Sequence, residues 1–500
     1  MTEQTKPNNR MDFQTAHQEL VRAMRPYSAA SIVNAALRVL RRPTAEPIDR
    51  LRDAPWQILL LVKWALADPE VQLFQAPPIP QSDFDMLRQR LWSIWRWADV
   101  QHATGHLFMR QLLNAQIDFQ RSPTFSFMRQ SALIARLQKG HVLRQKFNEL
   151  FGMEPETYLD LAFVAHAGVL DGRERLSKEW FSPLEPYYGD AVLASFLRLL
   201  SRDLGGLREE LLRPRGELAR PTELFEFPVL KQFPLLLRPD GHYECWHPMV
   251  FSRGLEDFVH RRFATLGPLY TEKYSKIFES YVVELLGESG LPFLDEQALK
   301  GRVGAGASVP EAAVCLAGCN LFVEAKMGLF PDALFVEGSS EHLRNRLKAA
   351  RRAIKQGRNI SSSLRSWQDR NGPSPPSGQD FLIVVTNREL NLSRGDLLAS
   401  MSHESDASPY PFAEAERFLP LSNVLFSSID DFELLIGMVR AGAIELAGFL
   451  RGVVAANADP STSAYYFGDH LKRVGGAAPQ SALMEQTVAA SLQRLSRIGE

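Results

Sequence analysis

Two charged side chains end the apolar stretch 321–326, whose sequence is LFVEAK. Because side chains alternate along a strand, Glu324 and Lys326 point to one face and Ala325 points to the other. Burying such a pair at the end of an apolar strand is costly unless the two groups bind something. A metal ion and a phosphate together would satisfy both groups, which indicates phosphodiester chemistry at this strand end.

A second carboxylate lies at hairpin distance from this pair. Glu311 lies at the start of a predicted strand, directly before its first residue in the range 312–316, and a turn over 318–320 joins that strand to the one over 321–325. The hairpin therefore brings the Glu311 carboxylate back beside Glu324. Two carboxylates that converge at the edge of a sheet suit the hard cations Mg²⁺ and Mn²⁺.

The backbone carbonyl of Ala325 is a further candidate ligand for this cation. Lys326 would hold and polarise a water for attack on a phosphodiester. The metal would lower the pKa of that water and neutralise charge that develops on the phosphoryl oxygens. The catalytic residues predicted from the sequence are Glu311, Glu324 and Lys326.

This arrangement resembles the PD-(D/E)XK nuclease superfamily, whose members share the restriction-endonuclease-like fold. The resemblance covers roughly residues 255–440, in a helix-strand-strand-strand-helix-strand order, and rests on Pro310, Glu311, Glu324, Ala325 and Lys326. It implies that Glu311 takes the place of the family's metal-binding aspartate. Glu324 takes the second carboxylate position and Lys326 takes the lysine position. Glu311 is the departure from the family pattern, because aspartate is usual there.

Two more residues match positions that some members of the family use. Glu279, on the preceding predicted helix, matches an acidic residue that serves as an extra metal ligand. Gln356, on the helix after the lysine, matches a polar residue at the active site. The resemblance therefore implies Glu279 as an additional metal ligand and Gln356 as an auxiliary residue.

A basic amphipathic helix is predicted over 341–358, directly after the proposed active site. Its basic residues fall on positions next to the apolar stripe and are candidate nucleic-acid contacts: Arg344, Lys348, Arg351, Arg352 and Lys355. Such a helix by itself is more often a solvated surface than a binding surface. Its place after the site favours phosphate binding by charge, which predicts salt-sensitive association with nucleic acid.

The remaining elements of this half predict a mixed sheet flanked by helices. A helix over 272–286 precedes the strands, and an extra strand is compatible with the sequence near Leu291. The continuous apolar run 381–386 is typical of a strand buried on both faces. A loop over 368–379 precedes it, and a strand over 423–427 follows and leads into a helix.

The length of 500 residues exceeds one hydrophobic core and indicates two or three domains. The predicted fold class is α+β or α/β, with a large α-helical N-terminal region and a restriction-endonuclease-like mixed sheet. The predicted segments are a helical recognition or regulatory region over 1–225, a β-hairpin connector over 226–254, a nuclease domain over 255–440 and C-terminal helices over 441–500.

Composition restricts the partners and the compartment. The formal net charge of −1 means that nucleic acid must be held by a local patch rather than a global field. Only three cysteines are present, which excludes a disulfide scaffold and fits a reducing cytosol. The N-terminus lacks the apolar region of a signal peptide, and the most apolar run, 56–66, falls short of the roughly 20 residues that span a bilayer. We therefore expect a cytoplasmic protein without a membrane partner.

The resemblance implies a metal-dependent endonuclease that hydrolyses DNA or RNA, transfer RNA included, with Mg²⁺ or Mn²⁺ as cofactor. Proteins that look like this often serve in bacterial defence against phage, and the large helical region then implies a protein trigger. Two alternatives stay open: a catalytically inactive nuclease-like protein that binds nucleic acid or a partner, and a helical scaffold whose sheet is only structural. The sequence is compatible with an oligomer and does not identify the substrate or the trigger.

Overall fold

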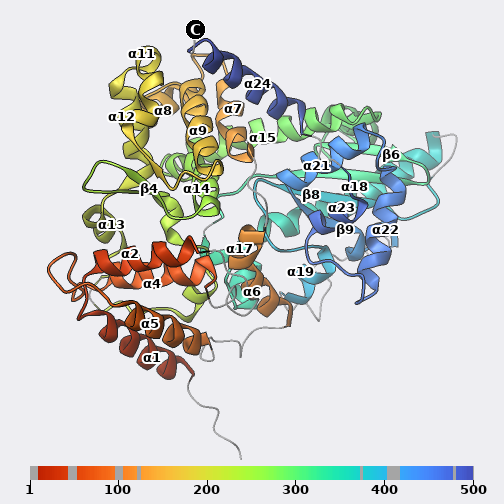
Figure 1. The fold of residues 1–500 in the computed structure, drawn as a ribbon. Coiled ribbons are helices and arrows are strands. Elements are labelled where there is room, and N and C mark those ends of the chain that lie inside the picture. The colour runs from red at the N-terminus through yellow and green to blue at the C-terminus, as the bar shows by residue number, and fades with distance from the viewer. Residues whose placement is uncertain are drawn as a thin grey trace, which may run out of the picture. The chain divides into compact units, whose positions relative to one another are not determined.

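The computed structural model describes residues 9–42, 53–95, 105–120, 125–214, 216–330, 332–371, 376–401, 417–476 and 480–498. The chain divides into two compact units, and Figure 1 labels many of their elements. The first unit comprises Met1–His102, Gln111–Arg262 and Thr487–Glu500. The second unit comprises Ala103–Arg110 and Phe263–Gln486.

Helices dominate the first unit, which confirms the helical prediction for residues 1–225. Apolar side chains at helical spacing form its core, and α4 is apolar around nearly its whole circumference and is buried accordingly. Its helices of eight or more residues are α1 (Asn9–Met24), α2 (Ala29–Leu40), α4 (Pro55–Ala67), α5 (Gln81–Ile94), α7 (Met128–Ala135), α8 (Val142–Phe151), α9 (Pro155–Leu170), α12 (Asp190–Leu200) and α13 (Leu204–Leu211). Helices α6 (Gly105–Gln120), α14 (Pro248–Ala264) and α24 (Ala482–Ser496) contain residues of both units.

A small sheet also belongs to the first unit. Its strands are β1 (Arg175–Leu176), β2 (Ser201–Arg202), β3 (Leu235–Leu237) and β4 (Tyr243–Cys245), in the order β1-β4-β3-β2. Strands β3 and β4 pair antiparallel, which confirms the hairpin predicted within 226–254. Gly241 in the connecting turn has φ +82°, a conformation that glycine adopts without steric cost. The hairpin strands are thus paired within a larger sheet.

His166 of α9 is a fully buried titratable group in the first unit. Its Nε2 lies 2.8 Å from Oγ of Ser252, and this hydroxyl donates a hydrogen bond to the carbonyl of Pro248. Nε2 of His166 therefore donates to Ser252, while Nδ1 has no hydrogen-bond partner among the described residues. Burial lowers the pKa of His166 to about 4.

We expect this histidine to destabilise the protein in mild acid. The unfolded chain, with a histidine pKa of about 6.5, binds a proton that the folded protein releases, so the unfolding free energy falls as the pH drops from about 6.5 to about 4. A His166→Gln variant can still donate to Ser252 but does not titrate. Urea unfolding should therefore show a smaller decrease in stability between neutral pH and pH 4.5 for this variant. Equal decreases would contradict the assignment, since all other histidines titrate in both proteins.

The second unit is built on a five-stranded mixed sheet in the order β5-β6-β7-β8-β9 within the described residues. Strands β5, β6 and β7 pair antiparallel, and β7, β8 and β9 pair parallel. The strands are β5 (Phe293–Asp295), β6 (Ala312–Leu316), β7 (Cys319–Lys326), β8 (Phe381–Thr386) and β9 (Val424–Ser428). Helix α15 (Pro268–Glu288) precedes β5, and α17 (Ser340–Arg346) and α18 (Lys348–Asn371) separate β7 from β8. The predicted strands are present in the predicted order, with β5 as the extra strand near Leu291, but a helix that was not predicted, α16 (Glu296–Val303), lies between β5 and β6.

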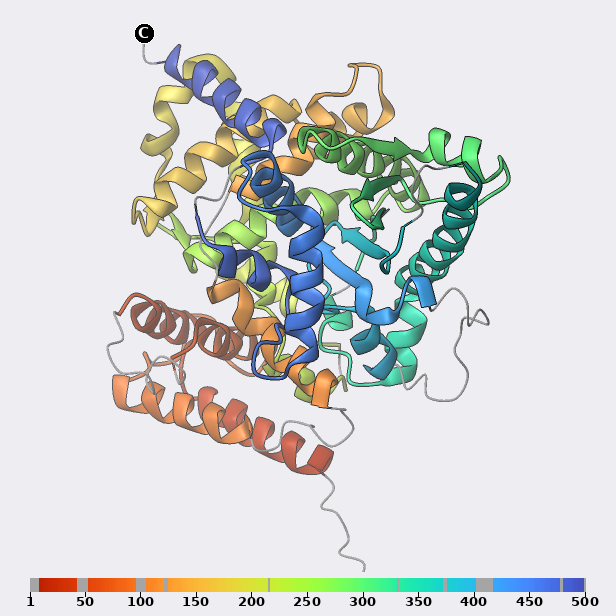
Figure 2. The same cartoon turned by 90° about the vertical axis from the view of Figure 1, so that its right-hand side faces the viewer.

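Helices cover the sheet of the second unit on both faces. Phe322, Leu382 and Val384 pack against the apolar side of α18, in a cluster that also contains Leu299 of α16 (Glu296–Val303). Figure 2 shows α18 and α21 (Ile429–Arg440) on opposite sides of the strands. Every residue of β8 is buried, as its continuous apolar run predicted. The other helices after β8 are α19 (Gly395–Met401), α22 (Leu446–Ala458) and α23 (Phe467–Val474).

Three of the predicted boundaries are wrong. The basic helix predicted over 341–358 is two helices, because the backbone of Leu347 (φ −98°, ψ 24°) leaves the helical conformation between α17 and α18. Helix α18 then continues to Asn371, into the loop predicted over 368–379, of which 372–375 lie outside the described residues. The β6–β7 turn is 317–318 rather than 318–320, because pairing extends to Leu316 opposite Cys319.

None of the helices in the described part of the chain is both long enough and apolar enough to cross a membrane.

Candidate active site

The β6–β7 hairpin places Glu311 and Glu324 side by side, as predicted. Ala312 pairs with Val323 in the antiparallel register, so the preceding residue, Glu311, lies opposite Glu324. Oε2 of Glu311 accepts a hydrogen bond of 2.6 Å from the backbone N–H of Ala325. Local strand pairing and this hydrogen bond together hold the Glu311 carboxylate at the end of β7.

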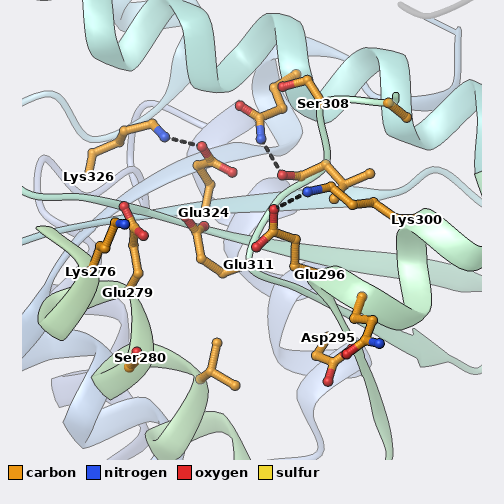
Figure 3. Close-up of a pocket in the computed structure, with 15 residues that line it drawn as sticks. Lys276, Glu279, Ser280, Asp295, Glu296, Lys300, Ser308, Glu311, Glu324 and Lys326 are labelled. Carbon is orange, nitrogen blue, oxygen red and sulfur yellow. Dashed lines mark hydrogen bonds and ion pairs between the residues drawn. The ribbon is translucent and has the colours of Figure 1, made fainter. Parts of the chain in front are cut away.

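Glu324 is buried and only partly satisfied. Its side chain is 1% exposed, and its Oε1 forms an ion pair with Nζ of Lys326, drawn in Figure 3. Its Oε2 is buried and has no hydrogen-bond partner among the described residues. An unsatisfied carboxylate oxygen is unfavourable in a protein interior unless a proton or a cation binds there.

The two carboxylates share an environment that disfavours two negative charges. Burial and the charge of Glu324 raise the pKa of Glu311 to about 8. Burial also raises the pKa of Glu324, although Lys326 acts in the opposite direction. One proton or one cation between the carboxylates relieves their repulsion.

The carboxylate pair opens into a cavity of about 840 Å³. Helices α15, α16 and α18 and the loop before β6 contribute to its walls, and Figure 3 shows its lining side chains. Glu279 of α15 and Gln356 of α18 both line it, so the structure brings these two predicted residues to the site. Burial raises the pKa of Glu279, opposed by the charge of Lys326.

Gln356 contacts the wall of the cavity rather than the carboxylates. Its Nε2 donates a hydrogen bond to the backbone carbonyl of Val309. This bond joins α18 to the loop that leads into β6 and Glu311. Gln356 is therefore placed to position the loop, in addition to presenting its amide to the cavity.

The five basic residues predicted to bind nucleic acid are not among the described residues that line the cavity. Lys348, Arg352 and Lys355 are exposed and share one stripe of α18, because they are four and three residues apart. Arg344 and Arg351 are half-buried. Arg352 lies one helical turn before Gln356, so the basic stripe runs next to the cavity and its nucleic-acid role stays a prediction.

Sequence reasoning missed several residues that line the cavity: Lys276, Ser280, Asp295, Glu296, Lys300 and Ser308. Lys276 and Ser280 lie on the same face of α15 as Glu279, so helical spacing from Glu279 was a usable signal for them. The ion pair of 2.5 Å between Lys300 and Glu296 lies on α16. No helix was expected there, and the sequence carried no comparable signal.

The residues present fit a divalent cation in their chemistry. The described residues contain no group of three or more His, Cys, Asp or Glu side chains arranged to hold a metal ion. The pair Glu311 and Glu324 nevertheless supplies two hard oxygen donors, one of which, Oε2 of Glu324, is buried without a partner. Glu279 lines the same cavity, and the carbonyl of Ala325 stays a predicted ligand.

Comparisons of the chain with protein-family models, with curated proteins and with solved structures give no match. The function is therefore inferred from the side chains of this cavity. They combine two neighbouring carboxylates and a lysine that forms an ion pair with one of them. The carboxylates face the open space of the cavity. This set of groups can bind a hard cation and present an ammonium group to an anionic substrate.

Proposed function

We propose that the chain is a metal-dependent nuclease of the PD-(D/E)XK type, which hydrolyses phosphodiester bonds of DNA or RNA. The observation that carries this proposal is the buried pair of Glu311 and Glu324 next to Lys326, with one Glu324 oxygen that has no hydrogen-bond partner in the described part of the chain. These groups lie at the end of β7 and open into a cavity large enough for part of a polymer substrate.

The order and direction of the elements support the same proposal. Helix α15, the antiparallel strands β5 to β7, the helices α17 and α18, and the parallel strand β8 resemble a restriction-endonuclease-like core in their order, with α16 inserted between β5 and β6. Glu311 immediately precedes β6, and Glu324 and Lys326 are among the last three residues of β7. The proposed site is thus where this family places its metal ligands and lysine.

Each residue has a defined role in this proposal. Glu311 and Glu324 would hold Mg²⁺ or Mn²⁺, with the carbonyl of Ala325 and the carboxylate of Glu279 as further ligands. A cation bound there supplies Lewis-acid stabilisation of charge on the phosphoryl oxygens. Binding requires Glu311 to release its proton and Glu324 to exchange Lys326 for the cation. The ammonium group of Lys326 is then available to hold the attacking water and to contact the phosphate.

A second candidate function is a nuclease-like protein that binds nucleic acid or a partner without cleaving it. The observation that favours it is the side chain of Glu311, which is longer than the usual aspartate and already accepts the N–H of Ala325. We also propose a role in bacterial defence against phage, in which the helical first unit responds to a protein trigger. That role rests on the resemblance of the site to the family.

Metal binding and cleavage together test the proposal. We expect calorimetry to detect Mn²⁺ binding by the wild type, and Glu324→Gln and Glu311→Gln to weaken it by more than about 100-fold, because each removes a direct ligand. Glu341→Gln, on the exposed start of α17, is the matched control and should bind as the wild type does. Cleavage of DNA or RNA should require Mg²⁺ and disappear in both site variants. Metal binding without any cleavage would favour the second candidate, and absence of both would overturn the nuclease proposal.

A further inference from the structure

We infer that Lys276 and Ser280 of α15 form a subsite for a phosphate next to the scissile one, so that the cavity takes a polynucleotide strand. This inference rests on the proposed nuclease function and adds to it the path of the substrate. Three lysines line the cavity: Lys276, Lys300 and Lys326.

The pairing of these lysines differs. Lys326 forms an ion pair with Glu324, and Lys300 forms an ion pair of 2.5 Å with Glu296. Lys276 is exposed and forms no ion pair with any residue that the structure describes. Lys276 can therefore bind an anionic ligand without first breaking an ion pair. Lys300 and Lys326 would each have to give up an existing ion pair to do so.

Helix geometry places a hydrogen-bond donor beside this charge. Lys276 and Ser280 are four residues apart, so their side chains lie on one face of α15, about one turn from each other. Both line the cavity, and Figure 3 shows both on the same segment of α15. Lysine ammonium groups and serine hydroxyls are common contacts of phosphate oxygens in nucleic-acid complexes. The two groups are thus suited to hold one phosphate together.

The opposite wall of the cavity disfavours phosphate. Helix α16 and the residue before it contribute Asp295, Glu296 and Lys300, which is one more carboxylate than lysine. On α15, by contrast, Lys276 balances Glu279. A polyanion is repelled from the wall with excess negative charge. The phosphates of a bound strand are therefore expected to follow α15.

The test combines single-residue variants with single neutral linkages in the substrate. A strand of the nucleic acid that the wild type cleaves is prepared with one methylphosphonate, which carries no charge, at each linkage near the cleaved bond. We expect kcat/KM of the wild type to fall about tenfold at one neighbouring linkage. For Lys276→Ala, kcat/KM on the unmodified strand should be about tenfold lower than for the wild type. The methylphosphonate at that linkage should then lower kcat/KM of this variant no further. Lys276→Ala should also reduce the salt dependence of binding by about 0.7 in log–log slope.

Two further variants make the result decisive. Lys273→Ala removes the same charge from the same helix outside the cavity and should behave as the wild type. Lys276→Arg keeps the positive charge, so the neutral linkage should still lower its kcat/KM, as in the wild type. This result would show that the effect of Lys276→Ala comes from the lost charge and not from misfolding. If the neutral linkage lowers kcat/KM of Lys276→Ala by the same factor as in the wild type at every position, the subsite is overturned while the nuclease proposal stays intact. Absence of cleavage by the wild type would overturn the nuclease proposal and the subsite with it.

Discussion

Replacing Lys326 by alanine should lower phosphodiester cleavage by about 10²- to 10⁴-fold, the usual contribution of a proton-transferring or charge-stabilising group. Affinity for Mn²⁺ should be retained or should rise, because the Lys326 ammonium group is bonded to Glu324 and competes with a cation for that carboxylate. Cleavage of DNA and RNA with Mg²⁺ and calorimetry with Mn²⁺ measure the two effects separately.

This separation distinguishes Lys326 from the proposed metal ligands. Glu324→Gln should lose metal binding and cleavage together, whereas Lys326→Ala should lose cleavage alone. Lys273→Ala, which removes an exposed lysine of α15 outside the cavity, is the matched control and should cleave as the wild type does. Cleavage by Lys326→Ala within about threefold of the wild type would remove the lysine from the proposed chemistry.

The second large effect is expected on stability, at a buried ion pair between β8 and α18. Asp380, just before β8, is fully buried and accepts hydrogen bonds from Nε and Nη2 of Arg365 at 2.8 and 2.6 Å. The hydroxyl of Ser361 donates to the same carboxylate at 2.6 Å, and the backbone N–H of Asn320 donates to it at 2.8 Å. Four donor groups from one helix, α18, and one strand, β7, thus meet at one carboxylate, at the opposite end of β7 from Glu324.

Asp380→Asn should lower the free energy of unfolding by about 3–5 kcal/mol, because it leaves the Arg365 guanidinium buried without a balancing charge. Asp369→Asn is the matched control, since Asp369 is exposed on the same helix, and should change stability by less than about 0.5 kcal/mol. Urea unfolding of the three proteins provides the comparison. A change below about 1 kcal/mol for Asp380→Asn would mean that the ion pair contributes little to holding α18 against the sheet.

Several features of the second unit could be predicted because their signals are local. Alternation along β7 set Glu324 and Lys326 on one face, and the spacing to Glu311 was that of a hairpin, so strand pairing alone brought the carboxylates together. The run 381–386 is apolar up to its last residue, Thr386, as is typical of a strand buried on both faces. Glu279 was expected at the site only from the family resemblance, and the structure places it in the lining of the cavity.

Other features depend on contacts between residues far apart in the chain. The break at Leu347 and the extension of α18 to Asn371 were not predicted. The carboxylate of Asp380 bonds Arg365 on α18, but its hydrogen bond to Asn320, from a distant strand, has no signature in local periodicity. Strands β1 and β2 are two residues long, too short for alternation to appear, and pair with the β3–β4 hairpin across more than 30 residues.

The sequence by itself determined which residues meet at the end of β7, because strand alternation and hairpin length are set by neighbouring residues. Only the tertiary structure decided what surrounds them. It buried Glu324 with an oxygen that no described residue hydrogen-bonds, and it enclosed the pair in a cavity between α15, α16 and α18. It also left Lys276 without an ion pair to any described residue, while Lys300 and Lys326 each have one. Burial and charge pairing depend on every element packed around a side chain, and for this reason they could not be deduced from spacing along the chain.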